Sequence, residues 1–415
     1  MSRQILKSIF LFTVISFAER GINYLITLAL SIYLPPEELG KLAYLLTVQA
    51  YIYPLILCYT NGAILLHYSK EKDGLNYFYN STVINFTAFI VIAIITLITG
   101  LLINLSSLLV IIALLTISLL EAVRLNYLAY NQAFLNIKKY AITAIFFVIA
   151  NLVITFFFLS RFQAKYEYRI YAILLSSILV FVLIVWSIKF KFNFRINKDL
   201  VRQVLSYGLP LLPHAFGLLA IESLNRYFLD SYGNKFELGL YSFAFTLAAP
   251  LGILNTAFIT AWTPHLYRLF KEDSDNSKRK IVKVHLLYIL FIIFIGILIS
   301  IFSKDILHLF SAKYFSSYKY LMVIPFYFSI QAIYVIFSAT LFYFKKNKYF
   351  IYLSFINIIF SVLINYFLFS NYGISATAYC AILSLTLFTT LIVILSHKTY
   401  PLVWIQLFGT QIKNV

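Results

Sequence analysis

The sequence predicts an all-α, polytopic membrane protein with twelve transmembrane helices. Three observations support this prediction: 62% of the 415 residues are hydrophobic, only 12% are charged, and long apolar runs recur along the chain. A soluble domain typically has about 25% charged residues, so this chain is too apolar for that class. The formal net charge of +18 comes from short basic clusters between the apolar runs. This pattern is typical of cytoplasmic loops, and it argues against nucleic acid as a partner.

Each of the twelve apolar runs is near or above the ~20 residues that a helix needs to cross a bilayer. No small-residue cleavage site follows the first run, so we expect a retained helix and not a signal peptide. The runs are Ser8–Tyr33, Leu42–Leu66, Tyr79–Ile103, Leu108–Tyr130, Tyr140–Ser160, Tyr168–Ile188, Gly208–Ser231, Leu240–Trp262, Val282–Phe302, Tyr320–Phe344, Tyr349–Phe369 and Ile374–Ser396. Because twelve is an even number, both termini should lie on the same side of the membrane.

The distribution of Lys and Arg between the loops predicts which side this is. With the N-terminus in the cytoplasm, 23 basic residues fall on the cytoplasmic side and 8 on the opposite side, while Arg20 and Arg226 lie inside helices. Cytoplasmic loops carry the excess of positive charge in membrane proteins. The bias therefore predicts a multi-pass protein with both termini in the cytoplasm.

The two halves of the chain resemble each other. Glu38-Leu39-Gly40 follows the first apolar run and Glu237-Leu238-Gly239 follows the seventh, and the hydrophilic stretch Phe190–Gln203 separates six runs from six. We therefore expect two six-helix bundles related by a pseudo-twofold axis along the membrane normal. The predicted boundaries are 1–190 for the first bundle, 191–205 for a cytoplasmic linker, 206–398 for the second bundle and 399–415 for a cytoplasmic tail.

Charged residues interrupt three of the apolar runs. A charge at the centre of a bilayer costs about 2.5–3.5 kcal/mol on insertion scales, so these side chains should face protein or a water-filled cavity. They are Glu19 and Arg20 in the first run, Glu121 and Arg124 in the fourth, and Glu222, Arg226 and Asp230 in the seventh. The first and seventh runs are equivalent in the repeat, so their charged faces should line one central cavity.

Two interpretations of these charges remain open. In the first, Arg20 and Arg226 bind an anionic head group such as pyrophosphate through charge-assisted hydrogen bonds, with Arg124 as a further candidate nearer the cytoplasm. In the second, the arginines are neutralised in structural pairs by the acids of the same helices. Those acids, which could also couple transport to an ion, are Glu19, Glu121, Glu222 and Asp230.

Other chemistry has little support in the sequence. A phosphate-cradling GxxxxGK[ST] loop is not present, and no cofactor motif is found. Cys58 and Cys380 both lie in apolar runs, so neither a disulfide framework nor a metal site is indicated. The longest outer loop, about Ser303–Lys319, is short for an enzyme that acts on a lipid-linked donor. We therefore expect a transporter and not an enzyme.

Several short segments carry a family resemblance: Ser206–Pro210, Asn225–Arg226, Leu238–Tyr241, Ala261–Pro264 with Tyr267, and Pro36–Gly40. They resemble the polysaccharide flippases of the multidrug/oligosaccharidyl-lipid/polysaccharide exporter superfamily, the Wzx-type O-antigen translocases. That family often has Asp before the arginine of the seventh helix, where this sequence has Asn225. This sequence therefore has no carboxyl group at that position, although Glu222 and Asp230 are close in sequence.

The resemblance implies a function. It implies two six-helix bundles around a V-shaped cavity and the flipping of an undecaprenyl-pyrophosphate-linked oligosaccharide across the inner membrane by alternating access. The bilayer, a polysaccharide polymerase and a chain-length regulator are the further partners it suggests. Two alternatives are a cation-coupled multidrug exporter of the same superfamily and a membrane polysaccharide polymerase or ligase.

The topology can be tested with reporter fusions. We expect fusions at Val415 and at Asn371 to report opposite sides of the membrane, because one transmembrane run separates the two positions. Paired activity measurements of an alkaline phosphatase fusion and a fluorescent protein fusion at each position provide the readout. The same side at both positions would contradict the number of helices.

Overall fold

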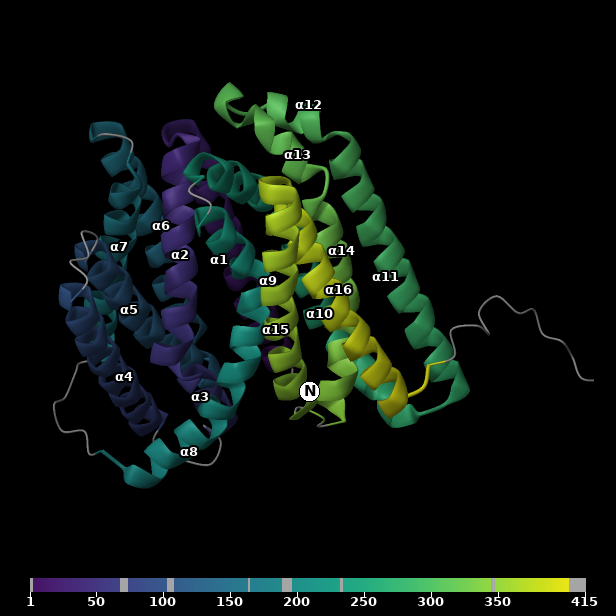
Figure 1. The fold of residues 1–415 in the computed structure, drawn as a ribbon. Coiled ribbons are helices and arrows are strands. Elements are labelled where there is room, and N and C mark those ends of the chain that lie inside the picture. Colours follow the sequence, from purple (N-terminus) through teal and green to yellow (C-terminus); the bar gives the residue numbers. More distant parts are fainter. Residues whose placement is uncertain are drawn as a thin grey trace, which may run out of the picture. The chain divides into compact units, whose positions relative to one another are not determined.

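The computed structural model describes residues 3–67, 74–102, 108–162, 165–188, 196–231, 234–344, 346 and 348–402. All regular secondary structure within these ranges is helical (Figure 1). Twelve of the helices in these ranges have 20 residues or more: α1 (Arg3–Tyr33), α2 (Pro36–Leu57), α4 (Gly74–Leu102), α5 (Leu108–Ala133), α6 (Ile137–Arg161), α7 (Tyr166–Ile188), α9 (Leu212–Ser231), α10 (Lys235–Glu272), α11 (Asp275–Ile301), α14 (Ile324–Tyr343), α15 (Lys348–Tyr372) and α16 (Thr377–Thr399). Each overlaps one of the predicted runs.

Shorter helices connect the long ones. They are α3 (Thr60–His67), α8 (Lys198–Gly208), α12 (Ser303–His308), α13 (Tyr318–Leu321) and the 3₁₀ turns η2 (Leu209–Leu211), η3 (Ala312–Ser317) and η4 (Gly373–Ala376). The long outer segment predicted at about Ser303–Lys319 is thus largely helical. The second predicted run is divided between α2 and α3, because Cys58 and Tyr59 have left-handed backbone angles, φ 47° and 52°, that end α2.

Eleven segments of the described residues are long and apolar enough to cross a membrane. Helix α1 is not among these eleven, and it carries Glu19 and Arg20 near its middle. One of the eleven, Lys198–Ile221, runs from α8 into the first half of α9. The chain is therefore a multi-pass membrane protein.

The chain forms two compact units, residues 1–219 and 220–415. The border lies inside α9, because α8 packs on the first unit. Leu200 and Val204 of α8 are buried in a cluster with Ala63, Ile64 and Tyr77. This contact explains why α8 belongs with the N-terminal unit, whereas the bundle boundaries at residues 190 and 206 stay a sequence-based prediction.

The same packing scheme occurs within each unit. In the first, α2, α4 and α7 pack on α5, and α6 packs on α7. In the second, the helices in the corresponding places of the chain behave alike: α10, α11 and α16 pack on α14, and α15 packs on α16. Both α5 and α14 are the fourth long helix of their half, and they are the most buried spans, at 56% and 72%. This correspondence supports the internal repeat.

Asparagine and serine caps explain where several helices begin. A side-chain oxygen at the N-cap accepts a hydrogen bond from a backbone N–H that the helix leaves free. Asn136 does this for α6, Asn197 for α8, Asn234 for α10 and Ser274 for α11. Pro36 occupies the first position of α2, where its missing N–H is not needed.

The close contact between α8 and the end of α2 can be tested with a glycine substitution. A Cβ at Gly208 would collide with the backbone carbonyl of Cys58, whereas a Cβ at Gly21 would meet nothing within 4 Å. We expect Gly208→Ala to lower the free energy of unfolding by about 1–3 kcal/mol, the usual effect of overpacking. Gly21→Ala, the matched control, should be neutral or stabilising because alanine favours helix. Thermal unfolding of the detergent-purified chain measures both; equal stability would contradict the contact.

Candidate functional site

Three polar side chains fasten α1 to the other helices of the first unit. They are three and four residues apart, so they lie on one face of the helix. The pairs are Ser16 with Tyr140 at 2.8 Å, Glu19 with Arg124 at 2.7 Å and Asn23 with Asn151 at 3.2 Å. Helix α1 is thus held in a defined rotation about its axis, with this face toward α5 and α6.

The pair at Glu19 is part of a three-residue ion cluster. Arg124 of α5 donates from Nη1 to Glu19 Oε1 at 2.7 Å, from Nε to Glu121 Oε2 at 2.7 Å and from Nη2 to Glu121 Oε1 at 2.6 Å. The guanidinium also lies 4.4 Å from the ring centre of Phe147. The Arg124 side chain is 7% exposed and Glu19 is 14% exposed, so water screens the cluster weakly. The carboxylates of Glu19 and Glu121 and the ring of Phe147 therefore all contact the guanidinium of Arg124.

The ion-pair partner of Glu19 in the structure is not the one that the second interpretation of the sequence expects. That interpretation pairs Glu19 with Arg20, its neighbour on the same helix, whereas the structure pairs it with Arg124 on α5. Successive residues on a helix point about 100° apart, so Glu19 and Arg20 cannot both face Arg124. The Arg20 side chain is exposed, and within the described residues it has no hydrogen bond, ion pair or ring contact.

The charges of α9 lie in the second unit. Arg226 is half-buried, and its guanidinium lies 5.4 Å from the ring centre of Phe245 on α10. Asp230 forms an ion pair with Lys235, at the start of α10. The side chain of Glu222 lies outside the described part of the structure, so the predicted pair with Arg226 stays a prediction.

Asn225, at the position where the family often has Asp, is buried in the second unit. Its Nδ2 lies 3.5 Å from the hydroxyl of Tyr241, to which it donates a long hydrogen bond. A neutral amide can lie here with fewer partners than a carboxylate would need. An Asn at this buried position therefore needs less compensation than an Asp carboxylate would.

Arg169, near the start of the predicted run Tyr168–Ile188, is a buried cation that the sequence analysis did not single out. It lies in the first turn of α7, 7% exposed, and its Nη1 donates to Asn151 Oδ1 at 2.5 Å and Thr155 Oγ1 at 2.7 Å. Because Asn151 also bonds Asn23, a polar chain connects α7 through α6 to α1. The signal in the sequence was the spacing of Asn151 and Thr155, which places two polar groups on one face of an apolar helix.

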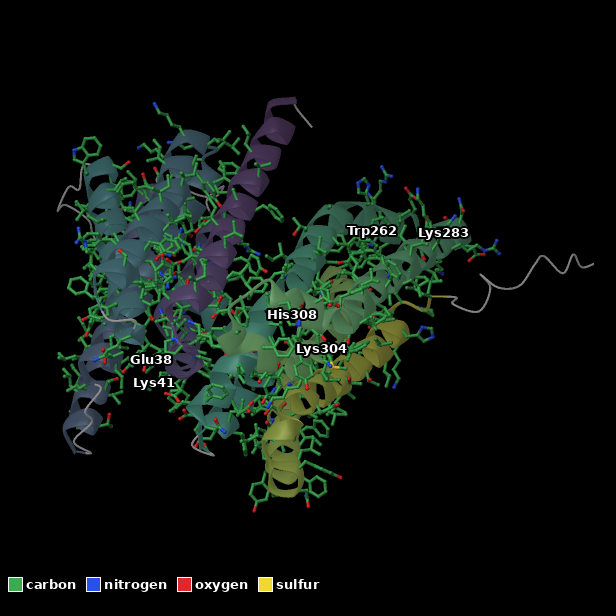
Figure 2. All side chains as sticks on the ribbon, turned by 90° about the horizontal axis from the view of Figure 1, so that it is seen from above. Glu38, Lys41, Trp262, Lys283, Lys304 and His308 are labelled. Atoms are coloured by element: carbon green, nitrogen blue, oxygen red, sulfur yellow. The ribbon has the colours of Figure 1, made fainter. Side chains whose placement is uncertain are left out.

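The repeated glutamates each connect the second long helix of a unit to a more distant segment. Glu38 binds Lys41 at 2.6 Å and accepts a hydrogen bond from the backbone N of Tyr166 at 3.0 Å; Figure 2 shows Glu38 and Lys41 side by side. In the second unit, Glu237 binds Lys319 at 2.8 Å and the hydroxyl of Tyr320 at 2.7 Å. In both halves, the glutamate of the Glu-Leu-Gly segment therefore connects the second long helix to a distant part of the same unit.

The described residues contain no cluster of three or more His, Cys, Asp or Glu side chains that could hold a metal ion. The cysteines Cys58 and Cys380 are both buried and free. The chemistry of the site, as far as the structure describes it, is therefore that of fixed charges and amides inside an apolar helical protein.

Comparison with known proteins identifies related sequences. The family described as "Polysaccharide biosynthesis protein" matches residues 5–270. A protein of Haemophilus influenzae described as "Lsg locus putative protein 1" is 26% identical over 243 residues, which are 52% of this chain and 58% of that protein. The chain thus matches somewhat more than half the length of this relative.

Solved transporter structures share the fold. The inward-facing conformation of a multidrug resistance MATE family transporter of the MOP superfamily superposes with a TM-score of 0.71 at 14% identity, covering 92% of this chain and 94% of that one. An outward-facing conformation gives 0.65 at 14% identity, covering 96% and 98%. A MOP superfamily transporter from Pyrococcus furiosus, described as having a binding pocket of reverse polarity, gives 0.59 at 13% identity, also covering 96% and 98%. The predicted fold class is thereby confirmed.

The ion cluster predicts a strong effect on stability. Arg124→Leu leaves the two carboxylates without their cation, so we expect the free energy of unfolding to fall by about 3–5 kcal/mol. Adding Glu19→Gln to Arg124→Leu should recover part of this loss, because one of the two carboxylates is then neutral. Arg161→Leu, the control, removes an exposed arginine from the last turn of α6 and should change the stability by less than about 0.5 kcal/mol. Thermal and denaturant unfolding in detergent give these values, and a fully additive double mutant would show that Glu19 and Arg124 do not interact.

Proposed function

The chain belongs to the polysaccharide biosynthesis protein family, and we propose that it flips an undecaprenyl-pyrophosphate-linked oligosaccharide from the cytoplasmic to the periplasmic leaflet by alternating access. Family membership and the transporter fold together confirm the family resemblance of the sequence. The nature of the cargo and the direction of transport are parts of the proposal. So are the inner-membrane location, the cytoplasmic termini and a role beside a polymerase and a chain-length regulator.

The observation that carries this proposal is the state of Arg20. Its neighbour Glu19 is held by Arg124, and the Arg20 side chain is exposed on α1. A cation at membrane depth that forms no hydrogen bond or ion pair is costly, whereas a diphosphate that meets it there would form charge-assisted hydrogen bonds. An anionic cargo would therefore neutralise the charge of Arg20, and Arg20 would in turn neutralise part of the charge of the cargo.

Arg226 is the second proposed contact, in the second unit. A guanidinium is planar and positively charged, and it is attracted to the electron-rich face of an aromatic ring. The Phe245 ring can orient Arg226 in this way. Arg124 has both a bidentate and a single carboxylate contact, so we assign to it the role of fixing α1. We propose direct substrate contact for Arg20 and Arg226.

One observation favours the alternative of a cation-coupled multidrug exporter. The ion cluster holds two carboxylates, Glu19 and Glu121, against one guanidinium, and an excess of acid suits a cationic drug or a coupling ion. The multidrug transporters among the similar structures share the fold at about 14% identity, which says nothing about cargo. Susceptibility of a deletion strain to lipophilic cations separates the two functions, since the flippase proposal predicts no change.

The two arginines provide the functional test. In a strain that lacks the gene, we expect Arg20→Ala and Arg226→Ala to restore at least roughly tenfold less surface polysaccharide than the unaltered chain, because a hydrogen bond to a charged group is worth about 1.5–3 kcal/mol. Arg226→Lys should restore an intermediate amount, since lysine keeps the charge and loses the planar fork. Gel profiles of the extracted polymer provide the measurement.

The control is Arg161→Ala, which removes an exposed arginine from the last turn of α6 and should leave the polymer unchanged. Immunoblots must show equal amounts of every variant, because the loss of a buried charge partner can also destabilise the fold. Normal polymer from well-expressed Arg20→Ala and Arg226→Ala would leave the arginines with a structural role only.

A further inference from the structure

The first unit contains a large groove that the proposed charge contacts do not use. It has a volume of about 1120 Å³ and lies between α4 and α7, with α5 behind it. The wall on α4 runs from Phe78 to Ile90, the wall on α7 runs from Phe181 to Ile188, and Val123 of α5 contributes to the floor. Figure 1 shows these three helices within the first unit. The volume is somewhat above the range of about 300–1,000 Å³ that is typical of small-molecule pockets.

The groove presents hydrocarbon and aromatic rings. Its hydroxyl groups are largely occupied within the protein: Thr82 donates to the carbonyl of Phe78 at 2.8 Å, Thr87 donates to the carbonyl of Val83 at 2.9 Å, and Ser187 is bonded at 2.7 Å to a tyrosine of α5. A ligand with polar groups along its length would lose its own hydrogen bonds to water here. The lining therefore suits an apolar chain.

The groove also has a defined depth in the membrane. Helices α4 and α7 both pack on α5, and the groove uses the first half of α4 and the last third of α7. Under the predicted topology, α4 starts and α7 ends at the cytoplasmic side. The groove would then open toward the inner leaflet, where the cargo of the proposed function is found before it is flipped.

The charge pattern of the sequence indicates an anionic amphiphile at this end. Lys70 and Lys72 precede α4 in the sequence, and Lys189 and Lys191 follow α7 directly. Cytoplasmic lysines of this kind attract anionic head groups. Trp186, which is 82% exposed at the same end of the groove, is typical of a residue at the membrane–water interface.

We propose that this groove binds the polyprenyl chain of the lipid-linked cargo, an inference that rests on the proposed function. A polyprenyl chain carries a methyl branch in every repeat, so it needs a wider channel than a linear acyl chain. The outer face of α4 beyond the groove, with Ile94 and Ile95 more than half exposed, is the ordinary surface for linear lipid chains. The groove would hold the tail on the first unit while the head group meets the arginines.

A photo-crosslinking experiment tests the assignment. The purified full-length chain is placed in nanodiscs of phosphatidylethanolamine and phosphatidylglycerol with a polyprenyl phosphate that carries a diazirine in its first repeats. We expect mass spectrometry to locate the label within residues 78–90 and 181–188, which line the groove. A tenfold excess of unlabelled polyprenyl phosphate should lower the labelling at least fivefold, and the same excess of phosphatidylglycerol should leave it unchanged.

A pair of tryptophan variants on α4 provides the matched comparison. Val83→Trp fills the groove and should reduce labelling at least fivefold, whereas Ile94→Trp, on the lipid-facing surface outside the groove, should not. Thermal unfolding of both variants must match that of the unaltered chain. Labelling spread over Ile94 and the other lipid-facing positions, or equal competition by phosphatidylglycerol, overturns the inference in favour of ordinary membrane lipid.

The outcome also separates this inference from the proposed function. If the unaltered chain restores surface polysaccharide in the deletion strain but the label lies elsewhere, the groove assignment alone is wrong. If the label lies in the groove but the unaltered chain restores no polymer, the binding of a polyprenyl chain stands and the proposed flippase activity is wrong.

Discussion

The ion cluster of Glu19, Glu121 and Arg124 is the interaction on which the arrangement of the first unit depends. It is weakly exposed, so neither carboxylate can replace its partner with water at low free energy. Holding Glu19 against α5 sets the rotation of α1, and Arg20 must then point in a different direction, since neighbouring residues on a helix diverge by about 100°. The paired acid thus determines how the adjacent cation is presented.

The two units solve the packing problem of a six-helix bundle in the same way but use different polar chemistry. Both place their fourth long helix at the centre, and both use a glutamate at the start of the second to bind a distant segment. The first unit contains a weakly exposed ion cluster around Arg124. In the second unit, neutral groups of Asn255, Tyr288 and Trp262 bond one another or the buried His285. Because the two units share the same hydrophobic packing of helices, their polar contacts can differ without a change of fold.

In the proposed function, the charged head group and the hydrocarbon tail of the cargo would meet different helices of the first unit. The exposed Arg20 lies on α1, whereas the apolar groove lies between α4 and α7, so a head group and a tail would meet different helices of the same unit. In the low dielectric of a bilayer, an anion and a cation attract strongly, while an apolar chain gains little by leaving lipid. The charges would therefore supply most of the affinity, and the groove would supply the orientation.

The sequence by itself determined the membrane class, the twelve helices and the repeat, because a bilayer requires about 20 apolar residues for each crossing and makes every charge conspicuous. It also identified which helices carry charges. Only the tertiary structure decided that Glu19 pairs with Arg124, that Arg169 is buried among amides and that α8 packs on the first unit. Glu19 and Arg124 lie 105 positions apart in the chain. Such a contact depends on how whole helices pack against one another, so no local spacing encodes it.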